Sequence, residues 1–305
     1  MLSISSSIRR LLLLVVLLSA LSVPALAVSP PVVRFEARSP GGWEVAEKCH
    51  AIWLDEGPAL AAGLLPALAK TDTVVCLVLD TTTFQGHFGT RMPDWGVGVA
   101  LSNGRVVALD YTRLSVVGRG TREVFLHEMV HALLFQGAQG QWLPTWLHEG
   151  AAMRYGGEWR FTDTVSLVLD GQVPNLAALQ GAFPGSAYRA DRAYRTSLLA
   201  VDRLIERFGP EVIADLVAAT ARVGNFSDAF VEVTGTTDTT FYAEFAAAMR
   251  LRFGWLVLLT RWPSLFVMLA LLLLVGGTLK FVRARRRLAE MADEEGGLPP
   301  ERELE

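Results

Sequence analysis

The spacing of hydrophobic residues predicts a sheet in the first part of the chain. Residues 73–83, TVVCLVLDTTT, form a short β-branched apolar run that ends in turn-prone residues, a pattern that predicts a buried strand. In residues 96–113, apolar and polar positions alternate on both sides of Asn103-Gly104, the residue pair preferred in tight hairpin turns. We therefore expect a strand and a hairpin in this region.

The spacing becomes helical after Gly120. Apolar residues then recur at steps of three and four as far as Phe135, which is the pattern of one helix face. Glycines follow this run, and Pro144 stands where a second helix begins. Glycine-containing breaks separate three further predicted helices, over residues 190–208, 210–222 and 237–253. The second part of the chain is therefore expected to be helical.

An apolar run near the N-terminus predicts export. Residues 11–21 follow Arg9 and Arg10 and precede the small-residue site Ala25-Leu26-Ala27. A basic start, a short apolar core and such a site are typical of a secretory signal peptide. Residues 1–27 are therefore predicted to be a signal peptide. A retained anchor helix is the alternative, but the core is short for crossing about 30 Å of hydrocarbon.

A second apolar run predicts a membrane anchor. The 18 residues from Trp262 to Leu279 carry no charge. As a helix with a rise of about 1.5 Å per residue, they are nearly long enough to cross a bilayer. Basic residues crowd directly after it: Lys280, Arg283, Arg285, Arg286 and Arg287. Cytoplasmic ends of membrane helices carry this excess, whereas a buried core helix, the alternative, does not need it.

These two segments define the expected domain organisation. A signal peptide (1–27) precedes an extracytoplasmic domain (28–254), which is sheet-rich over 28–118 and helical over 119–254. A transmembrane helix (262–281) and a cytoplasmic tail (282–305) follow. The protein is thus expected in the cell membrane, as a single-pass protein with its N-terminal domain in the periplasm or outside the cell.

Composition adds expectations about partners and redox state. Of the 305 residues 51% are hydrophobic, and the net charge is -3. Because basic residues cluster only beside the second apolar run, a nucleic-acid partner is not expected, and that cluster is expected to meet anionic lipid headgroups. Cys49 and Cys76 both lie in the exported part, where a disulfide and two buried thiols remain alternatives. No feature predicts the oligomeric state.

Three of the five histidines lie between Phe125 and Tyr155. His127 and His131 are four residues apart, so on a helix both imidazoles can reach one ion. Glu128 points about 100° away from His127, which suits it to hold a water beside the ion better than to be a ligand. His-Glu-x-x-His is typical of metallohydrolases whose carboxylate is a general base. Two histidines at this spacing are also compatible with core or capping roles.

A catalytic zinc ion needs a third protein ligand. The segment LPTWLHEGAAMRY (143–155) offers His148 and Glu149, and adjacent helical residues point about 100° apart, so only one is expected to face the ion. Both side chains bind zinc, so chemistry alone leaves the choice open. The small residues that follow, 150–152, are expected to let two helices that share an ion approach closely, with ordinary helix packing as the alternative.

Two patterns carry a resemblance to a known family: His127-Glu128-x-x-His131 and Pro144-x-Trp146-Leu147-x-Glu149-Gly150-x-Ala152. They resemble the peptidase MA-like group of gluzincin zinc metallopeptidases. The resemblance implies an α+β, zincin-like fold, in which a small mixed sheet lobe and a helical lobe surround the motif helix. In that family the glutamate before the glycine is the third ligand. The resemblance therefore implies Zn²⁺ bound by His127, His131 and Glu149, with a peptide or protein as substrate.

Further roles follow from this reading. Glu128 is expected to act as the general base, and a second donor to the reacting oxygen is expected by analogy. The family's usual tyrosine favours Tyr194 over Tyr188 for that donor, and core packing is the alternative for both. The strand from Gly96 to Leu101 is expected to present an edge to an extended peptide, with its glycines allowing close approach or marking a bulge.

Two other functions remain open from the sequence. One is a catalytically inactive scaffold or binding protein on a peptidase fold. The other is a metal-dependent amidase that acts on cell-wall material, because the His-Glu-x-x-His chemistry requires only a polarised carbonyl. The sequence also leaves open whether a peptidase would cleave within chains or at their ends.

Overall fold

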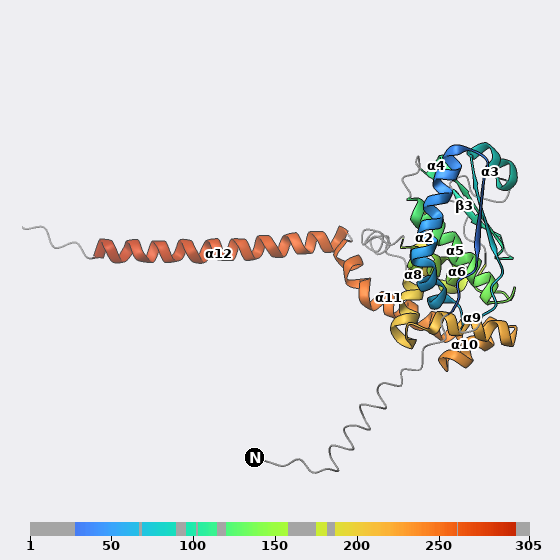
Figure 1. The fold of residues 1–305 in the computed structure, drawn as a ribbon. Coiled ribbons are helices and arrows are strands. Elements are labelled where there is room, and N and C mark those ends of the chain that lie inside the picture. The colour runs from blue at the N-terminus through green and yellow to red at the C-terminus, as the bar shows by residue number, and fades with distance from the viewer. Residues whose placement is uncertain are drawn as a thin grey trace, which may run out of the picture. The chain divides into compact units, whose positions relative to one another are not determined.

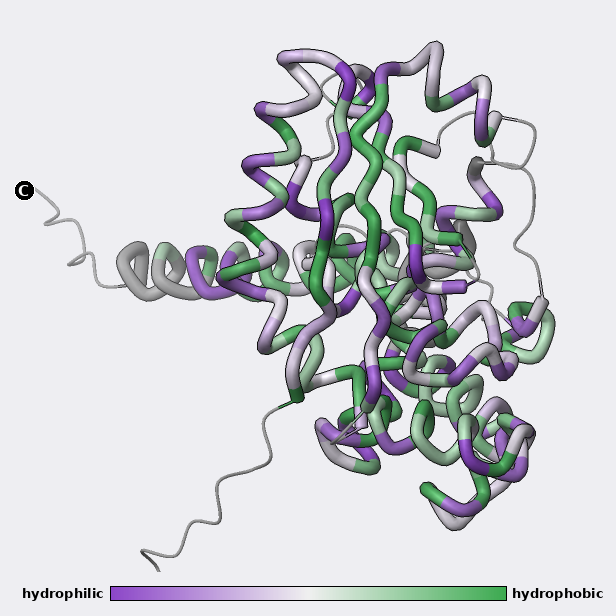
Figure 2. Tube along the Cα trace, turned by 45° about the vertical axis from the view of Figure 1, so that its right-hand side comes forward, coloured by the Kyte–Doolittle hydropathy of each residue, from purple (hydrophilic) through white to green (hydrophobic). Residues whose placement is uncertain are grey.

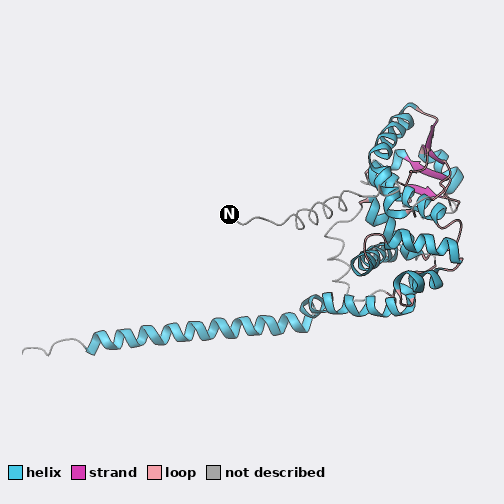
Figure 3. Cartoon of the chain, turned by 60° about the horizontal axis from the view of Figure 1, so that its bottom comes forward, coloured by secondary structure: helices cyan, strands magenta, loops and turns pink. Residues whose placement is uncertain are grey.

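The computed structural model of the protein describes residues 28–66, 69–89, 96–101, 103–114, 120–157, 175–181, 187–260 and 262–296. The predicted signal peptide lies outside these residues. The described chain has an α+β fold that is mostly helical, with one small mixed sheet (Figure 3). The first of two compact units ends at Ala247 and the second begins at Ala248.

Four strands form the sheet, in the order β1-β2-β4-β3. Their bounds are Val33–Ala37 for β1, Val74–Leu79 for β2, Gly98–Ala100 for β3 and Val106–Asp110 for β4. The β1–β2 and β2–β4 pairs are parallel, and β3 pairs antiparallel with β4. The predicted strand and hairpin are both confirmed, and the hairpin turn includes Gly104 with φ +66°. Figure 2 shows the strands as largely hydrophobic segments.

One face of the sheet is covered by two long helices, α2 (Pro40–Leu64) and α5 (Thr121–Gly137) (Figure 1). Aromatic contacts join the sheet and both helices, since the Phe125 ring of α5 lies 5.9 Å from Phe35 of β1 and 6.4 Å from Trp53 of α2. The short helix α3 (Thr81–Phe88) packs Phe84 against the opposite face. The motif helix α5 is therefore held directly against the sheet.

The hydrophobic pattern did not predict α2. Its buried positions are largely small residues, among them Gly42, Ala46, Gly57 and Ala61, so the apolar face has little contrast with the rest of the helix. The helix begins with a local signal instead, because the side chain of Ser39 accepts a hydrogen bond from the Gly42 backbone at 3.1 Å. Residues 28–118 thus contain all the described strands and also α2, α3 and α4 (Tyr111–Leu114).

Both cysteines lie at the contact between α2 and the sheet. Cys49 and Cys76 are free and buried, so of the two alternatives left open by the sequence the structure shows two thiols. Burial raises the pKa of Cys49 to about 12 and that of Cys76 well above its ordinary value. Because the thiolate is the reactive form, both side chains serve here as small apolar residues.

The second part of the chain is helical, as predicted. The described helices are α6 (Thr145–Gly156), α8 (Ala187–Phe208), α9 (Val212–Val223), α10 (Phe226–Thr234) and α11 (Asp238–Thr260), with a 3-10 turn at Leu176–Leu179. Of these, α10 alone was not predicted, since it fits between the breaks at Asn225 and Gly235. Asn225 caps it by accepting a hydrogen bond from the Asp228 backbone at 3.1 Å.

Helix α12 (Trp262–Gly296) contains the predicted membrane span. The segment Phe266–Leu288 has 23 residues, contains an 18-residue window with a mean hydropathy of 1.9 and is not buried within the protein. It is long and apolar enough to cross a bilayer. The alternative of a buried core helix does not fit side chains that are exposed along this whole segment.

Helix α6 lies between α5 and α8, and glycines allow both contacts. A Cβ atom on Gly150 would lie 2.2 Å from the Ser197 carbonyl oxygen of α8, and one on Gly156 would lie 3.2 Å from the His127 nitrogen of α5. From the sequence, residues 150–152 were expected to let the two motif helices approach closely. For Gly150 this was wrong, because Gly150 faces α8, and Gly156 serves the contact with α5.

This packing makes Gly150→Ala destabilising. The added methyl would overlap backbone atoms of α8, which have no rotamer to adjust, and overpacking of this kind costs about 1–3 kcal/mol. Thermal unfolding of the full chain in detergent, followed by circular dichroism, measures the effect. Gly86→Ala is the matched control, since its Cβ would meet nothing within 4 Å and alanine favours the helix. An unchanged midpoint for Gly150→Ala would contradict the packing argument.

Candidate metal centre

Helix α5 is held in place by polar contacts near both ends. Near its start, Arg122 pairs with Glu56 of α2 through two hydrogen bonds, one of them Nε to Oε1 at 2.7 Å, and donates to the Gly156 carbonyl of α6 at 3.3 Å. Near its end, Gln136 donates to the carbonyl oxygens of Gly104 at 2.6 Å and Asp72 at 3.2 Å. The helix, its neighbour α6 and the hairpin turn are thereby fixed to one another.

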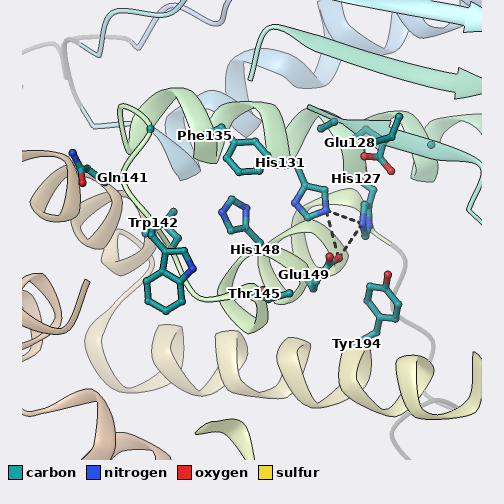
Figure 4. Close-up of a pocket in the computed structure, with 15 residues that line it drawn as sticks. His127, Glu128, His131, Phe135, Gln141, Trp142, Thr145, His148, Glu149 and Tyr194 are labelled. Carbon is teal, nitrogen blue, oxygen red and sulfur yellow. Dashed lines mark hydrogen bonds and ion pairs between the residues drawn. The ribbon is translucent and has the colours of Figure 1, made fainter. Parts of the chain in front are cut away.

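His127, His131 and Glu149 meet where α5 faces α6 (Figure 4). The Nε2 atoms of the two histidines are 3.2 Å apart, and the Glu149 Oε2 atom lies 3.4 Å from each of them. Helix α5 therefore brings two nitrogen donors, and helix α6 one oxygen donor, into the same small volume. The fold brings together the three residues that the sequence analysis favoured.

The donor set fits a tetrahedral ion. Zinc binds nitrogen and oxygen at about 2.0–2.2 Å, and donors at tetrahedral corners are then about 3.3–3.6 Å apart. The observed separations of 3.2–3.4 Å agree with that requirement. Glu149 Oε2 is also buried without a hydrogen-bond partner, a costly arrangement for a carboxylate oxygen unless a cation completes it. Three protein donors leave a fourth position for another ligand.

The charge of Glu149 is compatible with this role. Burial by itself raises the pKa of this carboxyl, but His131 and His127 opposite it lower the pKa by more, so the net shift is downward. Glu149 therefore remains ionised, as a metal ligand must be.

His148 takes a different direction from Glu149. Its ring centroid lies 4.7 Å from that of Phe135 and 5.6 Å from that of His131, and none of its atoms joins the three-residue cluster. Burial first, and then the neighbouring His131, lowers the pKa of His148 to about 3, so its imidazole is neutral. Of the two alternatives left open by chemistry, it is thus Glu149 that faces the histidine pair.

Glu128 lies beside the cluster and outside it, and only 8% of the residue is exposed. Strand β3 passes so close that a Cβ atom on Gly98 would lie 2.7 Å from Glu128 Oε1 and 2.8 Å from Cγ. Gly98 thus allows β3 to approach α5 closely, whereas the close approach of a peptide expected from the sequence stays a prediction. The edge strand and the carboxylate therefore share one wall of the site.

A cavity of about 530 Å³ opens over these groups. Its lining includes the cluster, Glu128, residues 98–100 of β3, residues 140–143 between α5 and α6, and Tyr194 of α8. Figure 4 shows the Tyr194 side chain directed toward the cluster. Tyr188 is 61% exposed and is not part of the lining. The structure thus places Tyr194 at the site and Tyr188 away from it.

One side of the cavity, formed by Phe135, Trp142, Leu143 and Thr145, was not predicted. Phe135 was read as one more apolar residue of a helix face, Trp142 lies in a loop, and Leu143 and Thr145 flank Pro144 at positions to which the motif assigns no role. The one signal in the sequence for this side of the cavity was Trp142, an aromatic residue in the loop that joins the two motif helices.

Fold and site together define an α+β protein with a potential metal centre between two helices. The family follows from comparison with known proteins. A sequence model of the peptidase MA superfamily matches residues 71–247, more than half of the chain, so the protein belongs to that superfamily. Its members are generally zinc-dependent and include inactive proteins. No match was found among curated proteins or solved structures.

The geometry predicts how metal content responds to substitution. The full chain, purified in detergent and equilibrated with zinc, is expected to hold about one ion, and Glu149→Ala to lose it because one of three protein donors is gone. His148→Ala is the control, since it removes the adjacent side chain and leaves the donors intact. Elemental analysis of the three proteins makes the measurement. Zinc retained by Glu149→Ala and lost by His148→Ala would reverse the assignment.

Proposed function

We propose that this protein is a membrane-anchored, zinc-dependent metallopeptidase that hydrolyses peptide bonds outside the cytoplasmic membrane. The convergence of His127, His131 and Glu149, with Glu128 beside them on a cavity wall, supports this proposal most directly. Membership of the peptidase MA superfamily supports the reaction class. The inactive-scaffold alternative has less support, because each of the four residues expected at the site lines the cavity.

The two histidines and Glu149 would hold the zinc ion. When bound, zinc supplies Lewis-acid chemistry that makes the peptide carbonyl electrophilic and water easier to deprotonate. Glu128 takes the proton from the attacking water and later delivers it to the leaving amine, so the proton is conserved across the reaction. Its position suits this task, because it borders the cavity next to the ligands without being one of them.

Two other elements would bind and orient the substrate. Tyr194 lies on the opposite wall from Glu128, where its hydroxyl would donate a hydrogen bond to the oxygen of the scissile carbonyl. Among the described strands β3 lies at an edge of the sheet, and it lines the cavity, so its outer edge would pair with an extended peptide. Gly98 keeps that strand close to Glu128, which places the bound peptide beside the base.

Helix α12 would anchor the peptidase domain in the membrane. Its side chains are exposed from Phe266 to Leu288. Lys280 and four arginines follow the uncharged run that ends at Leu279. These cations would contact anionic headgroups on the cytoplasmic side, which puts the domain that includes the metal centre on the opposite side. Residues 1–27 would direct its export.

Glu128→Gln is expected to lower peptide cleavage by about 10²–10⁴-fold, because the amide cannot accept the proton of water. Zinc content should remain at the wild-type level, since Glu128 is not a ligand. Mass spectrometry of a peptide library incubated with the full chain measures cleavage. Glu123→Gln makes the same chemical change on the same helix, outside the cavity lining, and should retain activity.

Cell-wall fragments tested beside the peptide library separate the amidase alternative from the peptidase. Cleavage of wall amides alone would identify an amidase. If zinc-loaded wild-type protein cleaved neither substrate, the scaffold alternative would replace the enzyme.

The proposed topology predicts which side of the membrane each unit faces. Leu54 is 67% exposed in the first unit and Met291 is 56% exposed in the second. A membrane-impermeant maleimide added outside the cytoplasmic membrane is expected to label Leu54→Cys and to label Met291→Cys only after permeabilisation. Because both native cysteines are buried, labelling of the unsubstituted protein measures the background. The opposite labelling pattern would refute the orientation.

A further inference from the structure

His148 is a buried polar side chain that the proposed reaction does not use. The residue is 9% exposed, and its Nδ1 atom is buried with no hydrogen-bond partner. Buried polar groups in native proteins are normally paired. The His148 side chain lines the cavity, so a molecule bound there is the candidate for the missing partner. Its neighbour Glu149 has a similar unpaired oxygen that the metal explains, and His148 has no such explanation.

The imidazole forms part of a recess beside the metal cluster. Phe135 covers one side of the ring, at 4.7 Å between centroids and an interplanar angle of 40°. Trp142, 56% exposed, lines the same cavity, and Figure 4 shows His148 between these two aromatic side chains and His131. Leu143 is buried in the same lining. The recess therefore has mostly apolar and aromatic walls and one imidazole.

We propose that the recess of Phe135, Trp142, Leu143 and His148 selects a tyrosine side chain next to the scissile bond. This inference rests on the proposed peptidase function. Because the recess and the metal cluster line one continuous cavity, a peptide whose carbonyl lies at the cluster has a neighbouring side chain within reach of the recess. The tyrosine ring packs against Trp142 and Phe135, and its hydroxyl forms a hydrogen bond with the imidazole of His148.

Phenylalanine and leucine side chains would pack against the apolar walls but would leave the imidazole of His148 without a hydrogen-bond partner. A site that contains a buried polar group discriminates strongly against a ligand that leaves the group unpaired, whereas apolar walls alone discriminate weakly. A lysine or glutamate side chain would bring a full charge between the apolar walls formed by Phe135, Trp142 and Leu143, which cannot solvate it. The tyrosine side chain matches both the walls and the imidazole.

The test compares peptides that differ only in tyrosine or phenylalanine at each position flanking the bond that a library identifies. For the wild-type full chain we expect kcat/KM to favour tyrosine by about tenfold or more at one position. In His148→Phe this ratio should fall to about one, because the ring is kept and its nitrogens are lost. His148→Asn retains a hydrogen-bonding group and should recover part of the preference. His87→Phe makes the same replacement on the exposed surface of α3 and should leave the ratio unchanged.

A binding measurement separates this inference from the proposed function. Peptides of fixed sequence that differ only in tyrosine or phenylalanine at one internal position, chosen without reference to a cleavage site, are titrated by calorimetry into Glu128→Gln and into the double variant that also carries His148→Phe. A tyrosine preference in the first that is lost in the second supports the recess even if the wild type cleaves nothing, which would contradict only the peptidase. Equal affinity for tyrosine and phenylalanine peptides in Glu128→Gln, or a preference that survives His148→Phe, overturns the inference.

Discussion

The close approach of α5 and α6 is the constraint on which the site depends. Three donor atoms from these helices lie within 3.4 Å of one another, and all three side chains are largely buried. A buried carboxylate and two imidazoles are expensive to desolvate, so the contact needs compensation from packing and, in our proposal, from a cation. Gly156 makes the approach possible because its missing Cβ leaves room for the His127 backbone.

The rest of the first unit maintains this contact. Arg122 links α5 to α2 and to the end of α6, so the helix that carries the histidines cannot shift without breaking a paired charge. On its other side α6 packs Gly150 against α8, the helix that brings Tyr194 to the cavity. Gln136 fixes the hairpin turn, which keeps β3 beside Glu128. Base, ligands and candidate substrate edge are thus positioned by one connected set of contacts.

The elements that could be predicted are those whose signal is local. Helical spacing brought His127 and His131 to one face, and Asn103-Gly104 predicted the hairpin that the structure contains. Contacts between distant segments could not be predicted in this way. The contrast between Glu149 and His148 depends on the rotation of α6 against α5, and the partner of Gly150 depends on α8. Helix α2 was missed because small buried residues give no periodic hydrophobic signal.

That rotation gives two consecutive residues different tasks. Adjacent helical positions differ by about 100°, so once Glu149 faces the histidines, His148 must point toward Phe135 and the recess. A shift of α6 by one residue would turn His148 toward the histidine pair in place of Glu149. An imidazole would then replace the carboxylate as the third ligand. Pro144 at the start of the helix and Gly157 at its end, with φ +76°, oppose such a shift because each suits a helix terminus. The metal cluster and the recess are therefore set by one helical register.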